Sequence, residues 1–134
     1  MKLADTSIIV AAAQSWNPAH EIARKALTGC RRAISHTLLE TYSVLTRSPS
    51  PFRIDAETAH TWLTAQFVGE VSLPVNSHLE TLSRLHSLGI TGGAIYDGII
   101  ALTASSHRAT LLTLDKRASA TYVKCGVKFQ LLSA

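Results

Sequence analysis

The chain has 134 residues, which is the size of one globular domain and too short for two. Apolar residues make up 46% of the chain and charged residues 16%, which excludes a disordered chain and a coiled coil, because both need more charge. The net charge of +4 is typical of a protein with a polyanionic partner but does not establish one. We therefore expect residues 1–134 to form a single domain with a large apolar core.

The first twenty residues do not predict a membrane helix or an export signal. The longest stretch there without Asp, Glu, Lys or Arg, residues 6–20, contains Asn17 and Pro18 and is too short to span a bilayer. Asp5 places a carboxylate where a signal peptide has its apolar region. We therefore expect a cytoplasmic protein in which Cys30 and Cys125, which are 95 residues apart, are reduced and buried.

Short apolar runs alternate with longer amphipathic segments, which is typical of strands and helices wound on a parallel sheet. In chain order, the pattern predicts a strand over 2–4, helices over 7–14 and 17–27, a strand over 33–35, helices around 38–45 and over 56–67, a strand over 71–73, helices over 77–88 and 94–106, a strand over 110–113, a helix over 116–122 and a strand over 127–131. The fold class expected from this order is α/β with a parallel sheet.

Four acidic residues from distant parts of the chain are expected at one edge of this sheet. Asp5 and Asp115 directly follow the first and fourth predicted strands. Glu40 falls in the first turn of the helix after the second strand, and Asp97 in the first turn of the helix that leads into the fourth. All four positions lie at the carboxyl ends of the strands, where α/β proteins bind their ligands.

Some of these acids also have a purely local interpretation. Asp5 and Asp115 can cap the helices that follow them. The segment from Thr37 to Glu40 matches a capping box, in which the glutamate bonds an amide at its own helix start. The segment from Ser77 to Glu80 matches the same pattern, and we interpret Glu80 as a cap only.

The position of Asp97 favours a functional site over a purely local role for the acids. Asp97 is the only formally charged residue between Arg84 and Arg108. Burying an unpaired carboxylate costs several kcal/mol, roughly, so the fold must supply a cation or a proton. A metal ion shared with the other three acids would meet this need. Carboxylate ligands favour Mg²⁺ or Mn²⁺ over zinc. The six histidines lack metal-ligand spacing and are expected on the surface or in loops: His20, His36, His60, His78, His86 and His107.

The same residues resemble the motifs of PIN domains, and in particular of the VapC ribonuclease toxins of bacterial toxin–antitoxin pairs. Asp5-Thr6-Ser7 resembles the first motif of the family, Leu38-Leu39-Glu40 the second, Tyr96–Ala101 with Asp97 the third, and Leu111–Asp115 the fourth. The four acids follow one another at spacings of 35, 57 and 18 residues. Gly92-Gly93 is similar to a subset of these toxins.

This resemblance implies a three-layer α/β/α sandwich with a central parallel sheet, an Mg²⁺- or Mn²⁺-dependent endoribonuclease, a homodimer, and a cognate VapB-type antitoxin. Asp5, Glu40, Asp97 and Asp115 would be the catalytic metal ligands, and Ser7 and Thr113 would orient a ligand or a water molecule from behind them. Lys116 and Arg117 stand where some PIN domains have a further acid, which leaves the number of metals open. These two cations are candidate contacts to the RNA backbone, as are Arg31, Arg32, Arg47 and Arg53.

Two other interpretations remain open at this point. A receiver-type phosphoacceptor module also gathers acids at strand ends, but it requires a pair of acids beside the first strand and an aspartate after the third, where Pro74-Val75-Asn76 stands. A catalytically inactive PIN-like scaffold is the second alternative, although the four acids argue against it. Cleavage of RNA that stops when metal is chelated would discriminate among the three.

Overall fold

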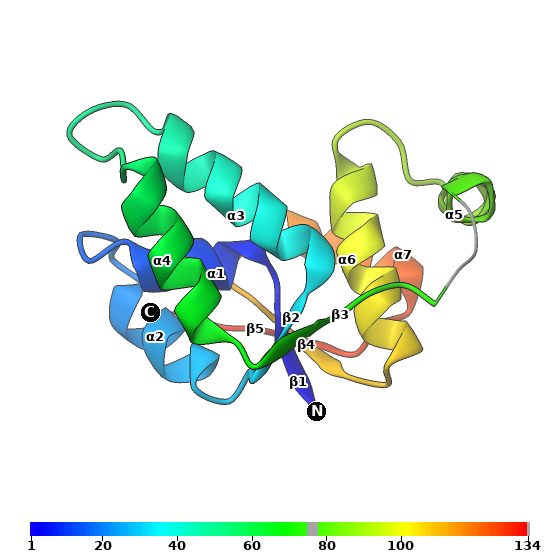
Figure 1. The fold of residues 1–134 in the computed structure, drawn as a ribbon. Helices are drawn as coiled ribbons and strands as arrows, with labels where there is room; N and C mark the ends of the chain where they lie inside the picture. Colours follow the sequence, from blue (N-terminus) through cyan, green and yellow to red (C-terminus); the bar gives the residue numbers. More distant parts are fainter. Residues whose placement is uncertain (75–77, 134) are drawn as a thin grey trace.

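The computed structural model describes residues 1–74 and 78–133, and it shows short parallel strands between two layers of helices (Figure 1). Strands β1 (Lys2–Ala4), β4 (Thr110–Thr113) and β5 (Phe129–Leu131) form one parallel sheet in the order β1-β4-β5. Strands β2 (Arg32–Ile34) and β3 (Gly69–Val71) form a second parallel pair, and β2 lies against β1. The order across the molecule is therefore β3-β2-β1-β4-β5.

Seven helices of the described chain connect and cover these strands. Their bounds are α1 (Thr6–Ala13), α2 (His20–Leu27), α3 (Ser35–Arg47), α4 (Ala56–Gln66), α5 (His78–Ser87), α6 (Ala94–Ser106) and α7 (Ala118–Cys125). None of the helices in residues 1–74 and 78–133 has the length and apolar character needed to cross a membrane.

Two apolar cores lie on opposite faces of the sheet, because successive side chains of a strand point to opposite sides. Leu3 and Leu111 pack with residues of α6 and α7 in one core. Their neighbours Ala4 and Leu112 pack with residues of α1 and α2 in the other. The architecture is the expected α/β/α sandwich. Cys30 and Cys125 are free and buried, as expected, and burial raises the pKa of Cys30 to about 11.

The order of strands and helices is as expected along the described chain, and the differences concern element ends. The second helix begins at His20 instead of residue 17, because the side-chain oxygen of Asn17 accepts the Ala19 N–H at 2.9 Å and forms a turn there. The third strand lies at 69–71 instead of 71–73. Residue 77, where the helix after it was expected to start, lies outside the described residues.

The last helix also begins later than expected, at Ala118 instead of residue 116. The Asp115 side chain accepts the backbone N–H of Arg117 at 2.9 Å and that of Ala118 at 3.4 Å. These bonds hold residues 115–117 in a turn between β4 and α7. Asp115 is therefore not the N-cap of α7, a position that Arg117 occupies, but it stabilises the turn that leads into the helix and stays at the carboxyl end of β4.

Candidate active site

The carboxyl ends of the parallel strands carry the acidic residues. Asp5 directly follows β1 and Asp115 lies two residues after the end of β4. Asp97 is in the first turn of α6, as expected. Glu40 lies in the second turn of α3 instead of the first, because that helix begins at Ser35, directly after β2.

The capping-box interpretation of Glu40 is wrong for the same reason. Thr37 lies inside α3, where its hydroxyl donates to the Ile34 carbonyl at 2.6 Å. The N-cap position is occupied by Ile34, which makes no side-chain cap bond. The Glu40 carboxylate is therefore not used to start its own helix. The similar interpretation of Glu80 involves Ser77, which lies outside the described residues.

Asp5 is held by groups from both ends of the chain. The side chain is 2% exposed, and its Oδ1 accepts the Ser7 hydroxyl at 2.5 Å and the Ile8 N–H at 3.4 Å. Its Oδ2 accepts the hydroxyl of the buried Tyr122 at 2.7 Å. Burial raises the pKa of Asp5, and these hydrogen bonds oppose that rise. Asp5 is thus the cap of α1, but the bond from Tyr122 goes beyond what a cap needs.

Ser7 and Thr113 join the turn after β1 to the turn after β4. The Ser7 hydroxyl oxygen accepts the Leu114 N–H at 2.9 Å, and the Thr113 hydroxyl oxygen accepts the Asp115 N–H at 3.0 Å. The two hydroxyl oxygens lie 3.4 Å apart. This network fixes the backbone that carries Asp115 relative to Asp5.

Asp97 shares its electrostatic environment with the other three acids. Burial is the main cause that raises its pKa to about 6, and the negative charges of Asp115, Asp5 and Glu40 raise it further. Residues from α3, α6 and the ends of β1 and β4 are therefore close enough to repel one another.

His36 lies beside Glu40 and was not expected to take part in the site. Its Nε2 is 3.7 Å from the Glu40 Oε2, which is too long for a hydrogen bond and is an ion-pair distance only when the ring is protonated. This neighbour holds the pKa of Glu40 below its ordinary value, against the effect of burial. The ring also stacks on Tyr96, with centroids 5.5 Å apart and planes 4° apart. The expectation of a surface or loop histidine is therefore wrong for His36.

Neither His36 nor Tyr122 was predicted from the sequence as part of the site. The signal for His36 was present, because it precedes Glu40 by four residues and such positions face each other on a helix. Tyr122 gave no signal, since 117 positions separate it from Asp5 and only the fold brings them together.

The chemistry of these side chains fits a hard divalent cation. All candidate ligands are carboxylates, and within residues 1–74 and 78–133 no lysine or arginine forms an ion pair with any of the four acids. A divalent cation would offset the repulsion that raises the pKa of Asp97. In the described part of the chain, no three His, Cys, Asp or Glu side chains are already arranged to hold a metal ion. The carboxylates would therefore have to turn toward a bound ion.

Lys116 and Arg117 follow Asp115 directly and are both exposed. Lys116 lines a groove together with Ser7 and Leu114, and none of the four acids lines this groove in the described chain. Its position suits a contact with an anionic group that approaches the carboxyl edge of the sheet.

The crowding of acids predicts how the metal-free protein responds to pH. The folded state holds the Asp97 proton more tightly than the unfolded state, whose pKa is near 3.8. Ionisation therefore costs stability, and the cost is absent below pH 3.8 and complete above about pH 6. In excess EDTA at pH 8, we expect Asp97→Asn to raise the melting temperature by about 3 °C, corresponding to about 1 kcal/mol for a half-exposed side chain.

Thermal unfolding of both proteins at low and high pH checks this prediction. The difference should disappear in acid, where Asp97 is protonated in the parent protein. A variant that melts below the parent at pH 8 in EDTA would show that Asp97 accepts structural hydrogen bonds instead.

The bond from Tyr122 to Asp5 gives a second prediction. Tyr122→Phe keeps the ring but leaves one buried Asp5 oxygen without its donor, so we expect a loss of about 1–3 kcal/mol in the free energy of unfolding. Affinity for Mn²⁺, measured by calorimetry, should fall about tenfold, because residues behind a ligand fix its orientation. Tyr42→Phe, in an exposed residue of α3, is the matched control and should change neither quantity. Unchanged Mn²⁺ affinity in Tyr122→Phe would contradict this role.

Comparison with known proteins places the chain in a family. A model described as "PIN domain" matches residues 2–124. Ribonuclease VapC40 of Mycobacterium tuberculosis is 38% identical over 130 residues, which cover 96% of this chain and 97% of that protein. Ribonuclease VapC27 of the same species is 45% identical over 92 residues, covering 69% and 67% respectively.

Solved structures show the same fold at low sequence identity. FitAcB from Neisseria gonorrhoeae superposes with a TM-score of 0.63 at 18% identity, covering 96% of each chain. VapBC2 from Rickettsia felis, solved with a promoter DNA fragment, gives a TM-score of 0.62 at 17% identity, covering 98% of each chain. The fold, the order of the motifs and the identity to these relatives agree, and the chain belongs to the PIN-domain family, within its VapC group.

Proposed function

We propose that this protein is a metal-dependent endoribonuclease that hydrolyses RNA phosphodiester bonds as the toxin of a VapBC-type toxin–antitoxin pair. The observation that carries the proposal is the placement of the acids: Asp5, Asp97 and Asp115 lie at the carboxyl edge of the sheet, and Glu40 lies on the helix that follows β2. Such crowding of negative charge is unfavourable unless a cation binds there. The ribonuclease names of the relatives support RNA as the substrate.

The proposed cofactor is Mg²⁺ or Mn²⁺, held by Asp5, Glu40, Asp97 and Asp115. PIN-domain ribonucleases are generally metal-dependent, and the all-oxygen donor set here favours a hard ion over zinc. When bound, such an ion lowers the pKa of water and stabilises negative charge on phosphate oxygens. The proposal assigns one ion to these four residues, and Lys116 and Arg117 offer no ligand for a second.

Other side chains of the site orient the proposed ligands and the substrate. Tyr122 and Ser7 each donate to a different oxygen of Asp5, which fixes the plane of its carboxylate. Burial and the neighbouring Asp5 raise the pKa of Tyr122, so its hydroxyl keeps its proton and remains a donor. Thr113 holds the backbone of Asp115. Lys116 and Arg117 would attract phosphate oxygens of RNA presented as a single strand, since a closed A-form groove does not admit this edge.

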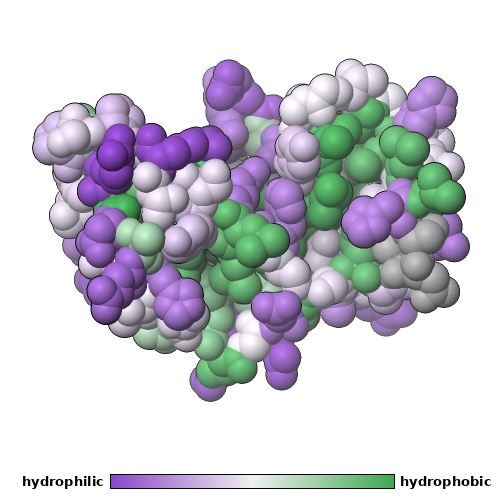
Figure 2. Space-filling view, turned by 45° about the horizontal axis from the view of Figure 1, so that its top comes forward, coloured by the Kyte–Doolittle hydropathy of each residue, from purple (hydrophilic) through white to green (hydrophobic). Residues whose placement is uncertain are grey.

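The proposed partners are a cognate VapB-type antitoxin and a second copy of the chain. Exposed apolar side chains supply surface for such contacts: Leu79 and Leu82 on α5, and Leu39 and Tyr42 on α3. Figure 2 shows apolar residues gathered over α5 and α6. We further propose that residues 1–134 act as one PIN domain and that the protein works in the cytoplasm, where the proposed RNA substrate is found.

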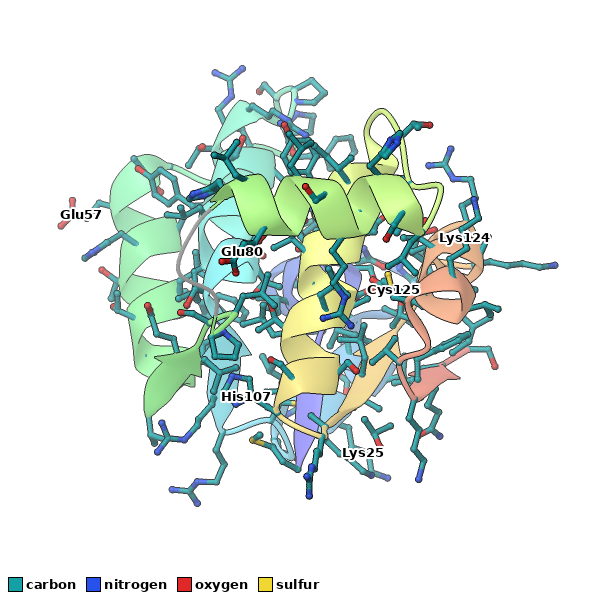
Figure 3. The ribbon with its side chains drawn as sticks, turned by 90° about the vertical axis from the view of Figure 1, so that its right-hand side faces the viewer. Lys25, Glu57, Glu80, His107, Lys124 and Cys125 are labelled. Atoms are coloured by element: carbon teal, nitrogen blue, oxygen red, sulfur yellow. The ribbon has the colours of Figure 1, made fainter. Side chains whose placement is uncertain are left out.

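Charge-neutralising variants test the proposal directly. We expect Glu40→Gln to abolish cleavage of a labelled RNA in Mg²⁺, because it removes one proposed ligand without changing side-chain size. Glu57→Gln is the matched control, since Glu57 is exposed on α4 and points away from the body of the molecule (Figure 3), and its activity should remain within a few-fold of the parent.

The readout is the appearance of new 5′ ends, which also identifies the cleavage sequence. Cleavage should stop in excess EDTA and should not be restored by zinc. Full activity in EDTA would contradict the metal assignment, and equal losses in the two variants would contradict the role of Glu40. A receiver-type module or an inactive scaffold would give no cleavage under any of these conditions.

A further inference from the structure

The amino ends of the strands carry a concentration of positive charge that the site described above does not use. Lys2 opens β1 and Arg32 opens β2, while Lys128 directly precedes β5 and Arg108 lies two residues before β4. All four side chains are exposed. Because all strands are parallel, these residues lie at the edge of the sheet opposite Asp5 and Asp115. We call them the basic edge.

Acidic residues are few around the basic edge. The segments that carry the four cations, residues 1–2, 28–32, 107–110 and 126–129, contain no Asp or Glu. Glu70 on the neighbouring strand β3 follows Gly69, the partner of Arg32, and its carboxylate accepts the Ser35 hydroxyl at 3.2 Å. In the part of the chain that the structure describes, none of the four cations forms an ion pair. Lys25 lies at the same end of the molecule as His107 (Figure 3) and adds to the positive potential.

The four cations are spread along one edge of the sheet. In the order β2, β1, β4, β5, they follow one another as Arg32, Lys2, Arg108 and Lys128. Successive side chains of a strand alternate between the two faces, so Lys2 lies on the face of Ala4 and Arg32 on the face of Ile34. Unpaired cations on both sides of one edge suit the phosphates of a folded nucleic-acid backbone, which bind mainly through charge.

The backbone of Arg108 gives an independent indication that its side chain is used. Arg108 has φ 53°, in the left-handed region, at the end of α6. It donates its N–H to the Ser105 carbonyl at 3.0 Å, and the following Ala109 N–H bonds the Ala104 carbonyl at 3.0 Å. Glycine is the usual residue at this position of a helix end. The other described residues with positive φ are all glycines: Gly89, Gly92 and Gly126.

A side chain in this conformation destabilises the fold relative to glycine. The Arg108 side chain makes no hydrogen bond or ion pair with the described residues that would compensate for this cost. Strained residues that persist without a structural benefit are concentrated at functional positions. An arginine at the centre of the basic edge is therefore better explained by a partner than by the fold.

We propose that the basic edge binds the phosphate backbone of RNA at a point remote from the scissile bond. The choice of RNA rests on the proposed function, whereas the phosphate chemistry rests on the charges alone. β4 has four residues, so about 13 Å of strand separates the two edges of the sheet. A folded RNA with one segment at the acids can reach the basic edge with another. Binding there anchors the substrate and lowers KM without taking part in the chemical step.

Anisotropy of a fluorescein-labelled single-stranded RNA, measured in EDTA to prevent cleavage, tests this surface. Arg32→Gln/Lys128→Gln removes two cations of the basic edge, and Arg84→Gln/Lys124→Gln removes the same charge from α5 and α7. Each phosphate contact that is lost should weaken binding about fivefold at about 0.1 M salt and reduce the salt dependence. We expect this effect for the first pair only. Equal weakening by both pairs, or by neither, would overturn the proposal.

Arg108→Gly separates a binding role from a structural one. We expect the variant to melt about 3 °C higher, because glycine relieves the left-handed strain, and to bind RNA about fivefold more weakly. A residue with only a structural role would not move the two measurements in opposite directions. Unchanged RNA affinity in a stabilised variant would exclude Arg108 from the surface and contradict the proposal.

Two further measurements identify the ligand and test the basic edge separately from the proposed nuclease activity. A DNA strand of the same sequence is titrated in parallel, and edge variants that weaken DNA binding but leave RNA binding unchanged would overturn the assignment to RNA. Cleavage in Mg²⁺ is measured separately, where the edge variants should raise KM and leave kcat unchanged. If the protein cleaves RNA but the edge variants bind RNA as the parent does, only the basic-edge proposal is contradicted. If the edge variants bind RNA more weakly but the parent cleaves no RNA, only the proposed nuclease activity is contradicted.

Discussion

The parallel direction of all five strands is the constraint on which the charge distribution of this protein depends. Parallel strands gather every carboxyl end at one edge and every amino end at the other. Asp5 and Asp115 follow strands and therefore meet, while Lys2 and Arg32 open strands and collect at the opposite edge. The parallel topology thus places the proposed active site at one edge of the sheet and a surface that can bind RNA phosphates at the other. The net charge of +4 does not show that acidic and basic residues lie at opposite edges of the sheet.

Gathering acids has a cost that the surrounding residues limit but do not remove. Hydroxyl donors bond both oxygens of the buried Asp5, and His36 lies beside Glu40. At Asp97 the opposing effect of His36 is smaller than that of burial and the neighbouring acids, so the pKa of Asp97 is raised to about 6. The remaining repulsion between the carboxylates destabilises the metal-free folded state, and a divalent cation would relieve it on binding. Stability, metal affinity and pH response of this protein are therefore linked through a single group of side chains.

Sequence patterns were sufficient for the fold class and for the positions of the acids along the chain. Apolar runs located the strands to within about two residues, and the strand-end rule located Asp5 and Asp115. Glu40 was assigned to the wrong helical turn, because the sequence does not show that α3 starts directly at the end of β2. The partners Tyr122 and His36 were missed for different reasons.

Tyr122 reaches Asp5 only through the tertiary packing of α7 against the sheet, which no local pattern encodes. His36 had a local signal, because it precedes Glu40 by four residues, but this spacing is not one that predicts a metal ligand. Asp5 shows a related limit. A single aspartate can both cap a helix and lie at a candidate site, and sequence alone does not separate the two roles.

The central claim is that Asp5, Glu40, Asp97 and Asp115 bind one divalent cation together. Calorimetric titration of Mn²⁺ into the metal-free protein tests it most directly, using the single variants Asp5→Asn, Glu40→Gln, Asp97→Asn and Asp115→Asn beside Glu57→Gln. The account predicts one Mn²⁺ per chain, with affinity reduced by about tenfold or more in each of the four variants and unchanged in the fifth. Parent-like Mn²⁺ affinity in any one of the four would contradict a shared site.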